Sequence, residues 1–189
     1  MIKNSKIIGM FGAVFFTTIV LADVPQWQIV QKESSLSFTA TQNNAPTIGK
    51  FNDFSGDIFF DPNQLKESHV HIVVDMTSVS TSYTEIADTL KSADWFNIAS
   101  YPQAVFTASD FIKTGDKSYR ANGKLMIRGK NEPIVMDFKL DEYTEKTAKV
   151  EGSVILKRLA FGIGQGEWQK TNNIKDEVKV SFVVNAIKK

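Results

Sequence analysis

Hydrophobic and polar residues alternate along most of the chain, with the period of two that half-buried β-strands require. The alternation predicts strands over residues 27–31, 36–40, 48–60, 70–76, 103–111, 121–127, 134–140, 148–156 and 178–186. Within 48–60, the pair Ser55-Gly56 is expected to mark a bulge or bend. The chain should therefore be mostly antiparallel sheet connected by short turns.

One stretch interrupts this pattern. Ser82 and Glu85 have the spacing of a capping box, which predicts a helix over residues 83–92. An aromatic-rich corner follows at 94–100, and Pro102 keeps the preceding Tyr101 extended. In a chain that is otherwise all strand, this helix and corner should cap, plug or line a space that the sheet encloses.

The fold class is all-β, with about eight or more antiparallel strands and one short helix. A sandwich and a closed up-and-down barrel both fit this description. The inward positions mix large residues with small ones, namely Ala40, Ala108, Ala121, Gly123, Ala148 and Gly152. These small residues either let the strands bend and close, or they leave a cavity for a ligand. The mixture favours a barrel with room inside.

Residues 1–22 have the layout of a cleaved signal peptide. Lys3 and Lys6 precede an apolar run, and small residues end it at Ala22. The alternative is an uncleaved membrane anchor, but the run is shorter than the roughly 20 residues of a spanning helix. We expect export to the periplasm and one mature domain over residues 23–189.

Charge and cysteine content exclude several classes of function. The signal segment carries two of the 22 basic residues, which leaves 20 basic against 21 acidic residues in the mature chain. No basic block is present, so nucleic acid is not an expected partner. The sequence contains no cysteine, which excludes disulfides and thiolate chemistry.

The sequence offers no convincing catalytic set. His69 and His71 share one strand face and could bind a metal together with Asp75, but two histidines alone are too few ligands. Both could equally face solvent. There is no Gly-x-Ser-x-Gly elbow. The three glycines within 162–166 do not lie in a βαβ unit, so they indicate bent backbone rather than a phosphate loop. We expect no cofactor and no resident metal.

Two arginines are candidates for contact with a ligand. Arg128 and Arg158 each lie at the end of an apolar strand, where the mouth of a barrel would be. A guanidinium is suited to a phosphate or carboxylate head group. Each could instead be a solvated charge at a strand end, and the sequence leaves both interpretations open.

Several motifs together resemble the YceI-like family. They are Leu90-x-Ser-x-Asp-Trp-Phe-Asn-x-x-x-Tyr-Pro-x-x-x-Phe106, Gly123-Lys-Leu-x-Ile-Arg-Gly129, Pro133 and Arg158-x-x-Phe-Gly-Ile163. Gly49-x-Phe-x-x-Phe-x-Gly56 and residues 77–81 also match. The resemblance covers essentially all of 27–187. The segment Gly162–Trp168 is similar to the subset that is encoded near cytochrome b561.

The resemblance implies an extended eight-stranded antiparallel lipocalin-like barrel that holds an isoprenoid lipid, such as a polyprenyl phosphate or a ubiquinone. It implies a secreted protein that binds, stores or transports this lipid and is not an enzyme. The alternative is an accessory partner of a membrane cytochrome b561 in quinone-linked electron transfer or stress response. A homodimer also stays open.

The expected cavity lining combines the inward positions of the strands with the aromatic corner. Tyr101 could also donate its hydroxyl to the head group of the lipid. Ordinary core packing is an equal explanation for each of these residues. The predicted lining consists of Phe38, Phe51, Trp95, Phe96, Tyr101, Phe106, Leu125, Ile127, Met136, Phe138, Val154, Phe161 and Phe182.

Overall fold

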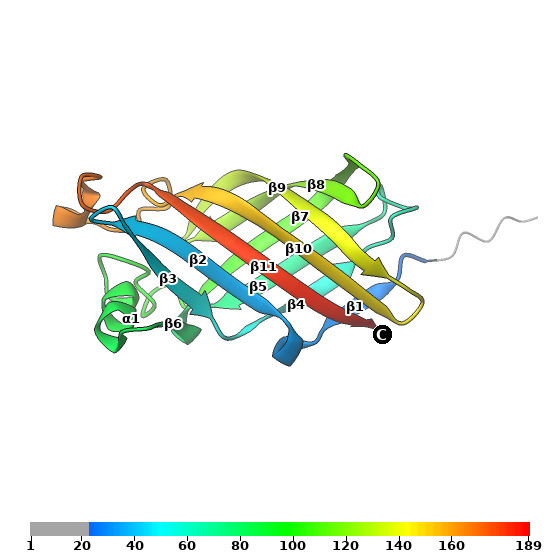
Figure 1. The fold of residues 1–189 in the computed structure, drawn as a ribbon, viewed down its shortest axis with the longest axis horizontal. Coiled ribbons are helices and arrows are strands. Elements are labelled where there is room, and N and C mark those ends of the chain that lie inside the picture. Colours follow the sequence, from blue (N-terminus) through cyan, green and yellow to red (C-terminus); the bar gives the residue numbers. More distant parts are fainter. Residues whose placement is uncertain (1–22) are drawn as a thin grey trace, which may run out of the picture.

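The computed structural model describes residues 23–189, so the predicted signal peptide lies outside the described residues. The elements follow the predicted alternation closely (Figure 1). The strands are β1 (Gln26–Ile29), β2 (Ser35–Gln42), β3 (Ala45–Phe51), β4 (Phe54–Phe59), β5 (His69–Asp75), β6 (Val79–Thr81), β7 (Gln103–Lys113), β8 (Ser118–Ile127), β9 (Lys130–Tyr143), β10 (Thr147–Lys157) and β11 (Glu177–Lys188). The helices are η1 (Gln31–Glu33), η2 (Met76–Ser78), α1 (Thr84–Lys91) and η3 (Gly166–Gln169).

The strands form one antiparallel sheet that closes on itself. Its closed ring has eight strands in the order β1-β4-β5-β7-β8-β9-β10-β11, and β11 returns to pair with β1. The remaining three strands prolong the wall: β2 pairs with β11 and β3, and β3 pairs with β6. The expected eight-stranded up-and-down barrel is therefore confirmed, and the sandwich is not formed.

The bend expected at Ser55-Gly56 lies elsewhere. The wall breaks at Asn52 and Asp53, between β3 and β4, where the Asn52 side chain donates to the carbonyl of Ser78 (2.9 Å). Gly56 stays inside β4, where a Cβ would meet the backbone and side chain of Ile72 on β5 at 2.9 Å. Glycine is needed there for the close approach of two strands and not for a bend.

The predicted helix is present, but its predicted cap is not. α1 begins at Thr84, and Tyr83 occupies the N-cap position without a side-chain hydrogen bond. The hydroxyl of Thr81 donates instead to the carbonyl of Tyr83 (2.6 Å) and fixes the approach to the helix. Ala87 and Leu90 are the buried residues of α1. The helix and η3 lie at the same end of the barrel, at the left of Figure 1; we call this the α1 end.

The opposite end, which we call the closed end, is filled by aromatic side chains. The indole nitrogen of Trp27 donates to the carbonyl of Phe60 (2.9 Å). The Phe60 ring contacts Phe111 and Tyr119 edge to face, with centroids 5.4 and 5.7 Å apart. Tyr143 lies against Trp27 at 5.3 Å. Edge-to-face pairs of this kind add to the apolar burial and hold the rings in defined positions.

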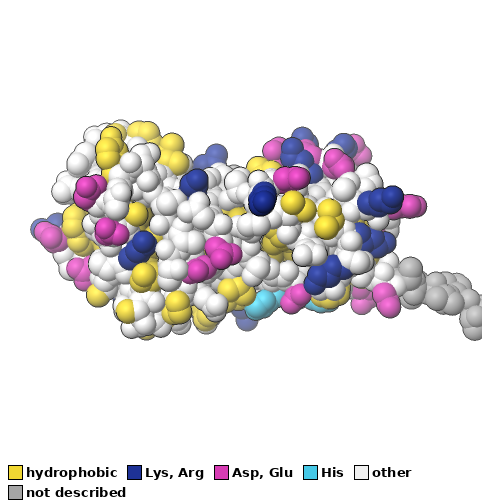
Figure 2. Space-filling model, turned by 90° about the horizontal axis from the view of Figure 1, so that it is seen from below, with side chains coloured by type: hydrophobic (Ala, Val, Ile, Leu, Met, Phe, Trp, Pro, Cys, Tyr) yellow, Lys and Arg dark blue, Asp and Glu magenta, His cyan; other side chains and the backbone are white. Residues whose placement is uncertain are grey.

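The outer surface carries both signs of charge. Figure 2 shows basic and acidic side chains interspersed over one face of the barrel, without a patch of one sign. Within residues 23–189, no helix is long and apolar enough to cross a bilayer. The surface on view therefore offers no broad electrostatic footprint for a strongly charged partner.

The closed end predicts a pH dependence of stability. Burial, together with the Asp61 carboxylate and Tyr119, raises the pKa of Tyr143 to about 12. An unfolded tyrosine ionises near 10, so the native state holds this proton more tightly. The stabilising contribution is complete below pH of about 10 and is lost as pH rises through about 12. Urea unfolding across this range should show a smaller loss of stability for Tyr143→Phe than for the wild type, and equal losses would contradict the assignment.

Candidate lipid cavity

One cavity of about 430 Å³ runs along the interior of the barrel. Phe111 and Leu140 line it near the closed end, and Trp168 and Ile174 line it at the α1 end. All eight strands of the ring contribute to the lining. Because both ends contribute, the cavity is an elongated channel and not a local void beneath one loop. Its volume lies within the usual range of small-molecule pockets, roughly 300–1,000 Å³.

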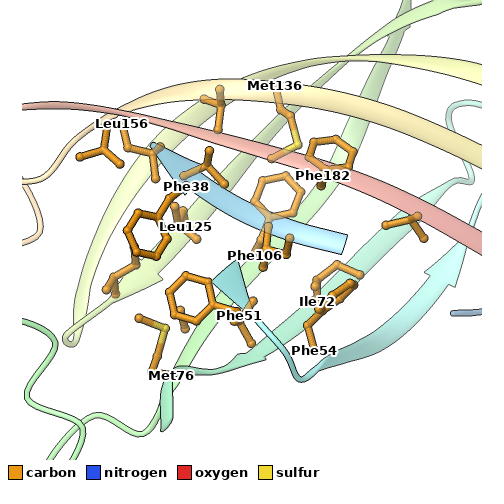
Figure 3. A pocket seen from close by; sticks show the side chains of 18 of the residues that line it. Phe38, Phe51, Phe54, Ile72, Met76, Phe106, Leu125, Met136, Leu156 and Phe182 are labelled. Atoms are coloured by element: carbon orange, nitrogen blue, oxygen red, sulfur yellow. The ribbon is translucent and has the colours of Figure 1, made fainter. Parts of the chain in front are cut away.

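The lining is almost entirely apolar. Of the 42 residues that line the cavity, only Gln42, Thr47, Thr89 and Arg158 have an amide, hydroxyl or charged side chain. These four lie on β2, β3, α1 and just after β10, all at the α1 end. Figure 3 shows the middle of the channel, where the side chains drawn carry carbon and sulfur alone. The channel therefore changes from purely hydrocarbon to partly polar toward the α1 end.

The phenylalanine rings lie along the wall because glycines underneath leave room for them. A Cβ on any of three glycines would come within 3.0 Å of such a ring. Real Cβ atoms do not come this close to a ring, so only a glycine leaves room for the ring at each of these positions. The pairs are Phe38 over Gly49, Phe106 over Gly123 and Phe182 over Gly152. This packing accounts for Gly123 and Gly152 among the small inward residues of the sequence.

Many inward-facing side chains are only half-buried, although they point into the barrel. Leu125, Met136, Val154, Val180 and Phe182 all keep accessible surface. All five line the cavity, so the surface that they keep faces the channel. In a filled core these apolar side chains would contact one another instead. The barrel therefore encloses apolar surface that is not covered by protein.

Eleven of the thirteen predicted lining residues do line the cavity. They come from β2, β3, β7, β8, β9, β10, β11 and the aromatic corner. The eleven are Phe38, Phe51, Trp95, Phe96, Phe106, Leu125, Ile127, Met136, Phe138, Val154 and Phe182.

The other two predicted residues, Tyr101 and Phe161, do not line the cavity. Tyr101 is 38% exposed, and its ring lies against Gly129 in the β8–β9 turn. It is thus on the outside of the α1 end and not over the channel. Phe161 is 1% exposed and packs in the core beneath the loop after β10, with Trp95 and Ile163. Tyr101 therefore packs on a turn and Phe161 packs within the core, and neither lines the channel.

Arg158 holds the loop that follows β10. Its side chain is 3% exposed, and it donates to the backbone carbonyls of Lys175 (3.0 Å), Ile163 (2.9 Å), Gly164 (3.5 Å), Trp168 (2.7 Å) and Ile174 (3.0 Å). Burial lowers the pKa of this guanidinium, and Asp176 opposes the effect. A guanidinium has five N–H donors, so this network leaves none for the head group that the sequence suggested.

Arg128 has a similar role on the neighbouring segment. Arg128 and Gly129 both have positive φ (51° and 70°) and form the tight turn between β8 and β9. The Arg128 side chain donates to the carbonyls of Ala93 (2.9 Å) and Trp95. It therefore fastens the aromatic corner to the barrel, and it does not line the cavity. Neither arginine is placed as a free cation at the channel.

The α1 end also contains an unsatisfied donor. Among the described residues, Trp95 Nε1 is the buried side-chain nitrogen or oxygen without a hydrogen-bond partner. The Trp95 ring lines the cavity, and Trp168 lies 5.7 Å from it. An orphaned donor of this kind costs about 1–3 kcal/mol. This nitrogen lies at the end of the barrel where the polar lining residues are.

Most lining residues that the sequence reasoning missed lie on strands that it had predicted. Phe54, Ile58 and Phe60 point inward from β4 and its end, and Val70 and Ile72 point inward from β5. Side chains alternate between the two faces of a strand, so counting every second position was sufficient to find these residues. Thr89, Trp168 and Ile174 had no such signal, because helices and loops bring them to the channel.

The two histidines lie outside the barrel. His69 stacks on Phe59 with centroids 4.6 Å apart, and its Nδ1 lies 3.2 Å from the carbonyl of Glu67. His71 is exposed on the same outward face of β5. In the part of the chain that the structure describes, no cluster of three or more histidine, cysteine or acidic side chains could hold a metal ion.

The fold and the site together define a closed eight-stranded barrel with an elongated apolar cavity. A family model described as the YceI-like domain matches residues 27–186. The chain therefore belongs to the YceI-like family.

Relatives from two bacteria support this assignment. The chain is 36% identical to Protein YceI of Escherichia coli O6:H1 over 116 residues, which are 58% of this chain and 60% of that protein. It is 30% identical to a UPF0312 protein of Yersinia pestis over 144 residues, 72% of each chain. The alignment to the Escherichia coli protein thus spans less than two thirds of its length.

Solved structures share the barrel. BcnA of Burkholderia cenocepacia superposes with a TM-score of 0.79 at 31% identity, covering 83% of this chain and 98% of that one. A polyisoprenoid binding domain from Saccharophagus degradans, implicated in plant cell wall breakdown, superposes with a TM-score of 0.72 at 17% identity. The latter match covers 86% of this chain and 98% of that domain, and it shows the fold alone.

The pairing of Phe38 with Gly49 predicts how the channel can be narrowed. In Gly49→Ala, the three atoms nearest to the new methyl group are all ring atoms of Phe38, so this ring must shift, and the open space beside it is the channel. Overpacking of this kind costs about 1–3 kcal/mol. Uptake of a fluorescent fatty acid or prenol probe should fall, and the double variant Gly49→Ala/Phe38→Leu should restore it. Gly115→Ala, in the β7–β8 turn, is the control. Unchanged uptake by Gly49→Ala would contradict the packing argument.

The carbonyl network of Arg158 predicts a large effect of a conservative substitution. Arg158→Lys keeps the charge but loses the planar fork, and it leaves buried carbonyls without donors. We expect a loss of about 3 kcal/mol in the free energy of unfolding, measured by urea denaturation. Arg128→Lys, which removes only two contacts at a half-buried site, should cost about 1 kcal/mol. Similar losses for the two variants would show that the Arg158 network contributes no more to stability than the two contacts of Arg128.

Proposed function

We propose that this protein binds an isoprenoid-type lipid in its channel and carries or stores it without chemical change. The observation that supports the proposal is the enclosed apolar surface: inward side chains from all eight ring strands face one elongated cavity and leave it uncovered. A long, flexible hydrocarbon chain matches such a space in shape and in polarity. The name of the Saccharophagus degradans domain, which shares the fold, adds isoprenoids as the ligand class.

The energetics favour an occupied channel. At about 24 cal/mol for each Å³ of cavity, a dry space of 430 Å³ would cost on the order of 10 kcal/mol. This is comparable with the whole stability of a typical domain. Water inside would find few partners, because the lining is hydrocarbon over most of its length. A bound lipid restores the missing dispersion contacts, so it should stabilise the barrel strongly.

Two further parts of the proposal concern location and a partner. The predicted signal peptide over residues 1–22 supports a periplasmic carrier. The segment Gly162–Trp168, which resembles the subset associated with cytochrome b561, lies at the α1 end beside the channel. As a second candidate function, a membrane cytochrome would dock at this end and exchange quinone with it. Pull-down of a membrane cytochrome with lipid-loaded and with lipid-free protein would distinguish docking to a cytochrome from lipid carriage alone. The homodimer stays a prediction.

We expect protein purified from cells to carry lipid. Native mass spectrometry should show a mass above that of the chain, and solvent extraction should release an isoprenoid compound. Delipidation should lower the melting temperature, because the ligand stabilises only the folded state. Protein that is repeatedly empty and takes up neither quinone nor polyprenyl lipid would refute the proposal.

Two aromatic residues of the same segment provide a matched control for this experiment. Trp95 lines the channel, whereas Tyr101 lies outside it. Trp95→Ala should reduce the amount of retained lipid more than Tyr101→Ala does, even though Tyr101 packs on the β8–β9 turn. Equal retention by the two variants would show that the aromatic corner is ordinary core and not part of the binding site.

A further inference from the structure

Among residues 23–189, no residue that lines the channel is a cation free to bind a ligand. Arg158 is the only charged residue among those that line the described cavity. Its donors are engaged by the backbone carbonyls of the loop that it holds. A phosphate group enclosed here would lose its hydration without gaining an opposite charge, which costs several kcal/mol.

Two neutral side chains at the same end are free. Between residues 23 and 189, neither the Gln42 amide nor the Thr47 hydroxyl makes a hydrogen bond to another side chain or to the backbone. In the β2–β3 pairing, Gln42 is opposite Ala45 and Thr47 is opposite Ala40. Gln42 and Thr47 are therefore diagonal neighbours on adjacent strands, with Cα atoms about 7–8 Å apart, and both line the channel.

The hairpin that carries them is held in place. The amide of Asn43 donates to the carbonyl of Asn173 (2.7 Å), and the amide of Lys175 donates to the carbonyl of Thr41 (3.0 Å). These bonds join the β2–β3 turn to the loop that Arg158 organises. The backbone that carries the Gln42 amide and the Thr47 hydroxyl is thus held at one corner of the channel. Each of the two groups can donate a hydrogen bond to a ligand oxygen and can also accept one from a ligand hydroxyl.

We propose that the polar end of the bound lipid lies against Gln42 and Thr47 and is uncharged, bearing an alcohol or carbonyl oxygen and not a phosphate. This inference rests on the proposed lipid-binding function and specifies the head group. The indole N–H of Trp95 at the same end is also unpartnered, but it does not contact the head group. Because that nitrogen is covered by protein, the first contacts are assigned to Gln42 and Thr47.

The test compares probes that share one isoprenoid chain and differ only in the head group. Delipidated mature protein is titrated with geranylgeraniol, geranylgeranyl phosphate, a quinone with a tail of the same length, and the hydrocarbon without a head group. A change in the intensity or wavelength of tryptophan emission reports binding, since Trp27, Trp95 and Trp168 all line the cavity. We expect the alcohol or the quinone to bind at least tenfold more tightly than the phosphate. Whichever of these two probes binds more tightly shows whether the oxygen of the head group belongs to an alcohol or to a carbonyl.

Variants locate the head group. Gln42→Leu/Thr47→Val should weaken binding of the neutral polar probes about tenfold and leave the hydrocarbon unaffected. Thr39→Val makes the same chemical change on the outward side of β2 and should alter nothing. Gln42→Arg should gain at least tenfold in affinity for the phosphate, with a dependence on salt.

The outcomes separate the inference from the function on which it rests. Binding of the phosphate as tight as or tighter than that of the alcohol and quinone would overturn the neutral head-group site and leave lipid binding intact. An effect of Thr39→Val equal to that of the double variant would also overturn it. Failure to bind any probe, the hydrocarbon included, would instead refute the proposed function.

Discussion

The contact between phenylalanine rings and glycines determines the character of this barrel. An eight-stranded barrel is at the size where its own side chains can fill the interior. Here the rings of Phe38, Phe106 and Phe182 cover glycines on the neighbouring strand, so their bulk lies along the wall. The centre is left open as a channel while the wall stays closely packed. The sequence left two roles for small inward residues such as Gly123 and Gly152: letting the strands bend and close, or leaving a cavity for a ligand. In the structure these two glycines make room for the rings of Phe106 and Phe182.

The two ends of the barrel are closed by different interactions. At the closed end, Trp27, Phe60 and Tyr119 pack against one another with few polar contacts. At the α1 end, hydrogen bonds to backbone carbonyls hold the covering segments, with Arg128 on the aromatic corner and Arg158 on the loop after β10. The carbonyl of Asp94 accepts from the amides of Gly164 and Gln165 (both 2.8 Å), so these two segments form one connected cover.

How far the sequence could predict this site depends on what places each residue. Strand positions such as Leu125 and Met136 were correct because alternation alone decides which side of a sheet they face. The arginines could not be predicted in this way. A guanidinium at a strand end can reach outward to solvent or fold back onto carbonyls, and only the path of the 158–176 loop decides between these. The prediction that Tyr101 lines the cavity was wrong for a related reason. The path of the chain places its ring on the turn at Gly129 and not over the channel.

The difference between the ends also indicates where a lipid can pass at least cost. Opening the closed end would expose a cluster of interlocked aromatic rings, each of which contributes a large buried apolar area. Opening the α1 end would also expose apolar side chains such as Trp95 and Phe161. The hydrogen bonds that it breaks, however, involve carbonyls and donors that water can satisfy, so the net cost of each bond is small. Elements of low local stability are those that move when ligands enter. The polar residues of the channel, Gln42, Thr47 and Thr89, lie at this same end, so a lipid that enters tail first leaves its head group beside them.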